Sequence, residues 1–221
     1  MEQFIILSNE SMCRSKDGGY RQCLNQDIKA FYHGTYQGGI GRHRIDGTIE
    51  NLICTFKNDI TPYAKNILCR VVRELVGILK TDLPQISSIC NCKNLRVCVV
   101  PRAKKESSYR PDQQYLRATI QYVVKQLPGF EDGTHDIMRH TDTLTTHRSR
   151  SGNGGDGESP YVGITWDTCT ISSDVNGKDV LLIDDLYTKT VNIDEDCIQA
   201  LLDQGARSVI FYSLGKTVLN R

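Results

Sequence analysis

Two adjacent carboxylates, Asp184 and Asp185, follow an apolar run at residues 180–183 that is typical of a buried strand. The next segment, residues 186–192, is polar and contains two threonines and a lysine. In an open parallel sheet, ligands bind beyond the carboxyl ends of the strands, and a turn into a helix offers unpaired backbone N–H groups to a phosphate. Carboxylates suit ribose hydroxyls or a Mg²⁺ held through water. The stretch therefore indicates a site for a sugar phosphate.

A second charged group follows another apolar run. Residues 95–101 read as a buried strand, and Arg102, Lys104 and Lys105 come directly after it. Such a basic loop suits pyrophosphate, although by itself it is also typical of a solvated surface. In the same way, an acid pair after a strand is also compatible with a simple turn or a helix cap.

The elements that position these residues are predicted from hydrophobic periodicity. Thr61 is expected to cap the first helix, and Gly205 to end the third. Helices are expected at residues 61–79, 111–127 and 194–204. Strands are expected at residues 95–101, 161–166, 180–185 and 208–214. The succession of strand, helix and strand predicts an α/β fold, with an open parallel sheet of about five strands flanked by helices.

Two segments of the sequence show no clear hydrophobic periodicity. Residues 1–50 are rich in Gly, Asn and polar aromatics, and we expect them to form a small N-terminal cap or hood on a domain of residues 51–221. Within them, residues 32–44 contain four glycines and are predicted to be a loop or hairpin. Residues 135–160 are predicted to form a long mobile loop, of the kind that is often functional in compact domains.

Composition limits the class of protein. The chain has 221 residues and a formal net charge of +1, so no global charge favours nucleic acid or an anionic membrane. The N-terminal apolar run is too short for a signal peptide, and no uncharged stretch approaches the ~20 residues of a membrane span. The nine cysteines are scattered and lack the two ligand pairs of a zinc site. We expect a soluble cytoplasmic protein with reduced thiols and no membrane partner.

The sequence "VLLIDDLYTKTVN" resembles the phosphoribosyl pyrophosphate (PRPP) signature of type I phosphoribosyltransferases, in the branch of the ComF and amidophosphoribosyltransferase-like proteins. "LICTFKND" (52–59) is similar to the short apolar-plus-Lys segment of that branch, "VCVVPRAKK" (97–105) to its pyrophosphate loop, and residues 139–160 to its flexible catalytic loop. The resemblance covers about residues 51–221 and implies the type I phosphoribosyltransferase fold.

The resemblance also implies roles for individual residues. Asp184 and Asp185 would bind the ribose hydroxyls and a Mg²⁺ ion through water. Arg102, Ala103 and Lys104 would contact pyrophosphate. The 5′-phosphate would be bound by the residues of the following loop, namely Tyr187, Thr188, Lys189, Thr190, Val191 and Asn192. Either Arg148 or Arg150 would close over the site from the flexible loop.

The implied reaction is a Mg²⁺-dependent displacement of pyrophosphate from PRPP by a nitrogen nucleophile, which the sequence does not identify. Two departures from the family favour an alternative. Thr190 stands where the family has a glycine, and three acids at residues 194–196 add negative charge near the expected phosphate. The alternative is a non-catalytic PRPP or nucleotide sensor, or an effector subunit of a larger bacterial assembly such as an antiphage system. The sequence does not decide the oligomeric state, and both a homodimer and a larger protein assembly are compatible with it.

Overall fold

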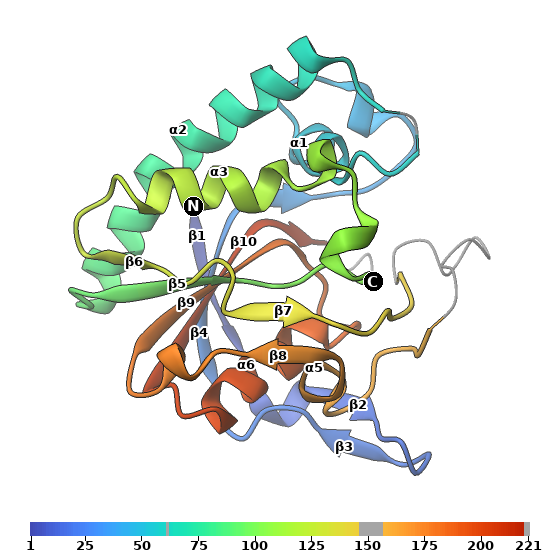
Figure 1. Ribbon diagram of the computed structural model, residues 1–221, viewed down its shortest axis with the longest axis vertical. Helices are drawn as coiled ribbons and strands as arrows, with labels where there is room; N and C mark the ends of the chain where they lie inside the picture. The colour runs from blue at the N-terminus through green and yellow to red at the C-terminus, as the bar shows by residue number, and fades with distance from the viewer. Residues whose placement is uncertain (61, 146–156, 219–221) are drawn as a thin grey trace.

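The computed structural model describes residues 1–60, 62–145 and 157–218 (Figure 1). Its centre is a sheet in the order β1-β4-β10-β9-β5-β6, in which every neighbouring pair except β1 and β4 is parallel. The strands are Glu2–Ile6 (β1), Ile28–Tyr36 (β4), Leu95–Val99 (β5), Phe130–Asp132 (β6), Asp179–Tyr187 (β9) and Ser208–Thr217 (β10). The predicted α/β class is confirmed, with six strands in the sheet where about five were expected.

Part of the N-terminal segment that we expected to be a cap belongs to the central sheet. β1 and β4 pair with each other, and β4 continues the parallel sheet beside β10. Residues 32–36, which we predicted to be loop or hairpin, form the end of β4. The prediction failed because the partners of β4 lie in β10, near the other end of the chain, and polar aromatics obscure its alternation. Only the small hairpin of Met12–Arg14 (β2) and Tyr20–Gln22 (β3) forms a separate sheet in this segment.

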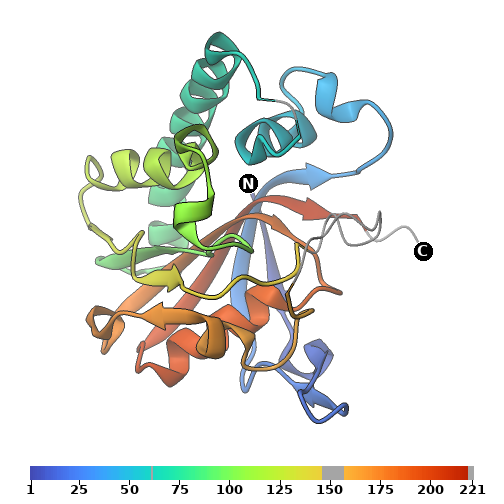
Figure 2. The same ribbon diagram turned by 45° about the vertical axis from the view of Figure 1, so that its right-hand side comes forward.

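Helices cover both faces of the sheet (Figures 1 and 2). One face carries the helices Ile49–Lys57 (α1), Lys65–Cys90 (α2) and Tyr115–Val124 (α3). Their apolar side chains pack on sheet residues such as Leu181 and Tyr212 in a first core. The other face carries Ile164–Thr168 (α5), Ile193–Asp203 (α6) and the hairpin of Ile137–Arg139 (β7) and Cys169–Ile171 (β8). Residues such as Leu182, Phe211 and Ile198 form the second core there.

The helices differ from the sequence predictions mainly at their ends. α2 begins at Lys65 after Ala64 and not at Thr61, which lies outside the described residues, and it continues through Pro84 to Cys90. The expected helix at 111–127 is a 3₁₀ turn followed by α3. The predicted helix at 194–204 is confirmed as α6, which begins one residue earlier. α2 has 26 residues, which is long enough to cross a membrane. However, no described helix, α2 included, is both long and apolar enough to do so.

The strand predicted at residues 161–166 was wrong, because this segment forms the short helix α5. The β-branched and aromatic residues there favour a strand locally. In the structure, the carboxylate of Asp196 on α6 accepts the backbone N–H groups of Gly163 and Thr165 at 2.5 and 2.7 Å. This contact from another element caps the helix, and no local pattern encodes it.

Two paired glycines allow α1 to pack closely on the sheet. Gly34 of β4 and Gly215 of β10 are neighbours in the strand register. A Cβ atom at Gly34 would lie 2.7 Å from Cγ1 of Ile49, and one at Gly215 would lie 2.8 Å from Cδ1 of Ile53. α1 therefore lies directly on the strands where side chains are absent, and its last residue, Lys57, reaches the carboxyl edge of the sheet.

We expect Gly34→Ala and Gly215→Ala each to destabilise the protein by about 1 to 3 kcal/mol, because an added methyl group overpacks the contact with α1. Urea unfolding measures this change. The matched control is Gly77→Ala on the exposed side of α2, where a Cβ meets nothing within 4 Å. The control should be neutral or stabilise by up to about 1 kcal/mol, since alanine favours a helix interior. Equal effects at all three positions would contradict the packing argument.

Candidate functional site

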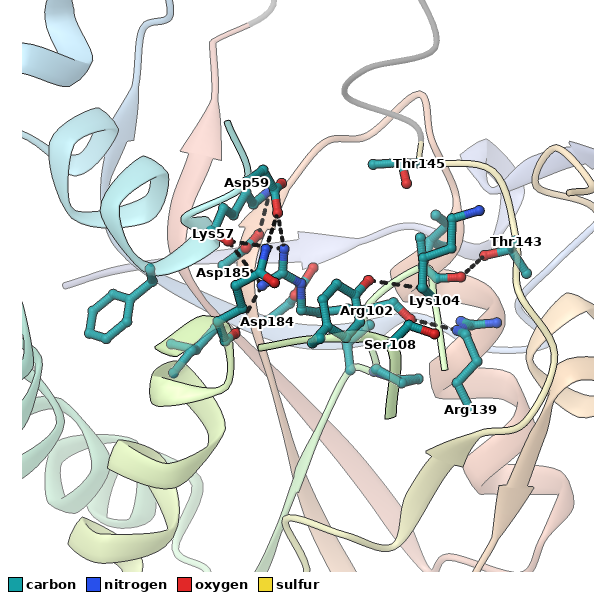
Figure 3. Close-up of a pocket in the computed structure, with 18 of the residues that line it drawn as sticks. Lys57, Asp59, Arg102, Lys104, Ser108, Arg139, Thr143, Thr145, Asp184 and Asp185 are labelled. Atoms are coloured by element: carbon teal, nitrogen blue, oxygen red, sulfur yellow. Dashed lines mark hydrogen bonds and ion pairs between the residues drawn. The ribbon is translucent and has the colours of Figure 1, made fainter. Parts of the chain in front are cut away.

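A pocket of about 380 Å³ lies at the carboxyl ends of β5 and β9 (Figure 3). The register of these parallel neighbours pairs Val99 with Ile183, so the segments that follow both strands reach the same edge of the sheet. The pocket is lined by five of the residues that the sequence pointed to, namely Asp184, Asp185, Arg102, Ala103 and Lys104. The structure therefore brings together the acid pair and the basic loop, which are far apart in the sequence.

The two carboxylates of the acid pair have different partners. Asp185 faces α1, and its Oδ1 atom lies 3.2 Å from Nζ of Lys57. Asp184 faces α6, where its carboxyl group lies beside that of Asp194. Two buried carboxylates side by side repel each other, so this arrangement favours the protonated form of the pair. Successive residues of a strand point to opposite faces, which explains why neighbours in sequence meet such different surroundings.

Electrostatics reinforce this difference. Burial raises the pKa of Asp184 to about 7, and the charge of Asp185 adds to the effect. Burial and the nearby Asp184 carboxyl raise the pKa of Asp194 well above its usual range. Burial alone would lower the pKa of Lys57, but Asp185 and Asp184 outweigh it and leave this pKa raised. Lys57 is therefore a charged ammonium at neutral pH, whereas burial and mutual repulsion favour protonation in the Asp184–Asp194 pair.

Arg102 ties the loop after β5 to the end of α1. Its Nη1 and Nη2 atoms both donate to the backbone carbonyl of Lys57 at 3.1 Å, and Nη1 also donates to the carbonyl of Gln113 at 2.9 Å. Nη2 pairs with Oδ1 of Asp59 at 2.5 Å, and the guanidinium lies 4.2 Å from the centre of the Tyr109 ring. These contacts occupy the guanidinium group. Arg102 therefore positions the pocket walls, and its charge is already balanced by Asp59.

Arg139, which the sequence patterns did not single out, is a buried cation of the pocket. It ends β7 and is only 9% exposed. Its Nε donates to the Arg102 carbonyl at 2.6 Å and its Nη1 to the Thr168 hydroxyl at 2.5 Å, but it has no carboxylate partner within the part of the chain that the structure describes. A buried charge without a counter-ion is costly, so this guanidinium indicates an anionic ligand. The only sequence signal was an arginine directly after the apolar residues Ile137 and Met138.

Two residues expected to bind the 5′-phosphate have other contacts. Tyr187 is buried, and its hydroxyl donates to Oε1 of Glu195 at 2.8 Å. Asn192 precedes α6 with a φ of +59°, and its Nδ2 donates to the carbonyl of Met12 at 3.0 Å. Neither side chain lines the pocket of the acid pair. This placement does not fit the phosphate contacts that the resemblance implied for them.

The rest of the expected phosphate loop lies at the surface next to the acid pair. Lys189 forms an ion pair with Glu10, both of them exposed. Thr190 is exposed and Thr188 half-buried, and the N–H of Val191 donates to the Thr188 carbonyl at 2.9 Å, which closes a turn. The two threonine side chains are thus accessible, although they are not among the side chains that line the pocket.

The expected catalytic loop is described only at its two ends. Arg148 and Arg150 lie outside the described residues. Before them, Thr143 donates its N–H to the Ala103 carbonyl at 2.7 Å, and Leu144 donates its N–H to the Glu158 carbonyl at 3.0 Å. Both ends of the loop are therefore joined beside the pocket, and Thr143, Leu144 and Thr145 line it.

The three acids at the start of α6 are turned inward, so they do not present the negative surface that the sequence suggested. Asp194 lies beside Asp184, Glu195 accepts a hydrogen bond from Tyr187, and Asp196 accepts two from the backbone at the start of α5. All three are almost completely buried. Within the described residues, Asp194 and Glu195 each have one buried carboxyl oxygen without a hydrogen-bond partner.

The acid pair does not fit the role of direct Mg²⁺ ligand. Asp185 is already paired with the ammonium of Lys57, and burial raises the pKa of Asp184 to about 7. Across the described ranges, no group of three or more His, Cys, Asp or Glu side chains is arranged to hold a metal ion. All nine cysteines are free thiols. The Mg²⁺ ion that the resemblance implies stays a prediction.

Comparison with known proteins does not place the chain in a family. No model of a protein family matches the sequence, and no curated protein matches it either. The phosphoribosyltransferase resemblance therefore has to be argued from the geometry of the site.

The buried carboxyl groups predict a pH-dependent stability. Burial raises the pKa of Glu195 from 4.5 to about 7. The folded state therefore binds more protons than the unfolded state in this range, and the free energy of unfolding falls as the pH rises from about 4.5 through 7. We expect Glu195→Gln, which keeps an acceptor for Tyr187, to reduce this loss by up to about 3 kcal/mol. Urea unfolding at pH 5 and pH 8 measures it, and an unchanged pH dependence would contradict a raised pKa at Glu195.

Proposed function

We propose that the protein binds PRPP in this pocket and transfers its ribose 5-phosphate to a nitrogen nucleophile, as a type I phosphoribosyltransferase does. One observation carries the proposal: the acid pair near the carboxyl end of β9 and the basic loop after β5 line one pocket at the same edge of two parallel neighbours. Ligands of open α/β sheets bind at such an edge. A sugar bearing anionic groups matches both kinds of side chain.

The chemistry divides between the two sides of the pocket. Figure 3 shows Lys57, Asp184 and Asp185 gathered on one side, whereas Lys104 and Arg139 lie across from them. The carboxyl groups suit the ribose hydroxyls and the positive charge that develops on the ring as the bond to pyrophosphate loosens. Arg139 and Lys104 suit the growing negative charge of the leaving group. Positioning accounts for most of such a transfer, so no dedicated base is needed.

We expect PRPP to stabilise the wild-type protein against heat and the double variant Asp184→Asn, Asp185→Asn to lose this effect. The substitutions keep the size of both side chains but remove the charges that accept the ribose hydroxyls. A ligand at a hundred times its dissociation constant adds about 2.7 kcal/mol, which is visible in a thermal shift. The control is Asp203→Asn, an exposed acid at the end of α6. Absence of any shift in the wild type at millimolar PRPP would refute the site.

A second candidate is a non-catalytic PRPP or nucleotide sensor. The contacts of Tyr187 and Asn192 favour it, because both side chains are engaged away from the place where the 5′-phosphate is expected. Thr190 adds to this, since a side chain there prevents the close backbone approach that a glycine allows. A pocket of this kind can keep its affinity for the sugar phosphate while it positions the substrate too poorly for transfer.

Pyrophosphate release separates the two candidates. With PRPP present, we expect release when at least one purine, pyrimidine or simple amine of an acceptor panel is added, because transfer frees one pyrophosphate for each bond formed. The panel is run beside binding measurements on the same preparation, with the double acid-pair variant as the inactive control. Binding of PRPP without release from any acceptor would eliminate the transferase and leave the sensor.

A further inference from the structure

Lys57 is built into the pocket as a buried cation. It is the last residue of α1, and its side chain is only 21% exposed. Its ammonium group lies 3.2 Å from Oδ1 of Asp185 and is also attracted by the charge of Asp184. No other lysine or arginine in the described ranges forms an ion pair with either member of the acid pair. The sequence resemblance included this lysine only as part of the segment at residues 52–59 and assigned it no role.

The main chain at Lys57 is held as firmly as its side chain. Asn58 follows it in a left-handed conformation with a φ of +50° and ends α1. The Asn58 side chain donates to Asp112 at 2.9 Å and accepts the N–H of Tyr63 at 2.9 Å. The Lys57 carbonyl accepts both terminal nitrogens of Arg102. The ammonium is therefore held in place beside the acid pair, unlike the end of a free surface lysine.

A fixed ammonium and a divalent cation cannot share one carboxylate without repulsion. A metal ion bound at Asp185 would have to displace Lys57, and the displaced side chain would remain inside the same partly buried pocket. An anionic sugar phosphate, by contrast, needs some positive charge near the acid pair to offset the repulsion from two carboxylates. Lys57 supplies that charge without a metal.

We propose that the Lys57 ammonium is the resident counter-ion of Asp185 in the acid pair, and that the pocket binds a ribose phosphate without a divalent cation there. The inference rests on the proposed function, because it concerns the same site. It assigns to a side chain of this protein the charge that the resemblance assigned to Mg²⁺.

Calorimetric titration with ribose 5-phosphate tests the inference, since this sugar has no pyrophosphate to carry Mg²⁺ itself. The wild type should bind equally well, within about threefold, in EDTA and in millimolar MgCl₂. Lys57→Met keeps the apolar stem but removes the charge, so its affinity in EDTA should fall by at least about tenfold, or 1.4 kcal/mol. Added Mg²⁺ should restore part of that loss. Lys57→Arg should bind without metal, as the wild type does.

The matched control is Lys80→Met, an exposed lysine on α2 that is not among the residues lining the pocket. It should bind like the wild type in both buffers.

Wild-type binding only in the presence of Mg²⁺ would overturn the role of Lys57 and leave the proposed function intact. Normal binding of Lys57→Met in EDTA would overturn that role as well. Should Lys57→Met not fold, the wild-type comparison and Lys57→Arg still decide the matter. If neither ribose 5-phosphate nor PRPP bound in either buffer, the proposed function itself would fail.

Discussion

The hydrogen bonds from Arg102 to the end of α1 are the contact on which the pocket depends. The loop after β5 and the end of α1 reach the carboxyl edge of the sheet by separate connections, and Arg102 joins them through the Lys57 carbonyl and Asp59. Arginine suits this role because its planar group offers five donors in fixed directions, whereas a lysine offers a single mobile charge. Arg139 continues the chain of contacts by holding the Arg102 carbonyl from the opposite side of the loop.

The acid pair illustrates how neighbours in sequence acquire different chemistry. Asp185 faces a fixed ammonium and Asp184 faces another carboxyl group, because the pleat of β9 sends them to opposite faces of the sheet. The charges around the pocket are therefore largely balanced within the protein. Arg139 is the exception within the described residues, and it is the group that most directly suits an anion.

Local patterns predicted the elements whose signals agree with their tertiary setting. α6 has an apolar side that packs on the sheet, and Gly205, with a φ of +99°, ends it as expected. β9 is buried on both faces and was recognised from its apolar run. The prediction failed for α5, because a carboxylate from another helix caps it. It failed for β4 because the strand pairs with the far end of the chain.

By itself, the sequence determined that two acids follow an apolar run in a buried strand and that a basic loop follows another strand, since each feature is encoded within about ten neighbouring residues. It also indicated the parallel α/β class from the order of strands and helices. Only the tertiary structure decided that these two segments share a pocket, that Lys57 and Asp194 are the partners of the acid pair, and that Arg139 lies buried beside them. These facts depend on strand register and helix packing between distant parts of the chain, and no local pattern of residue types carries that information.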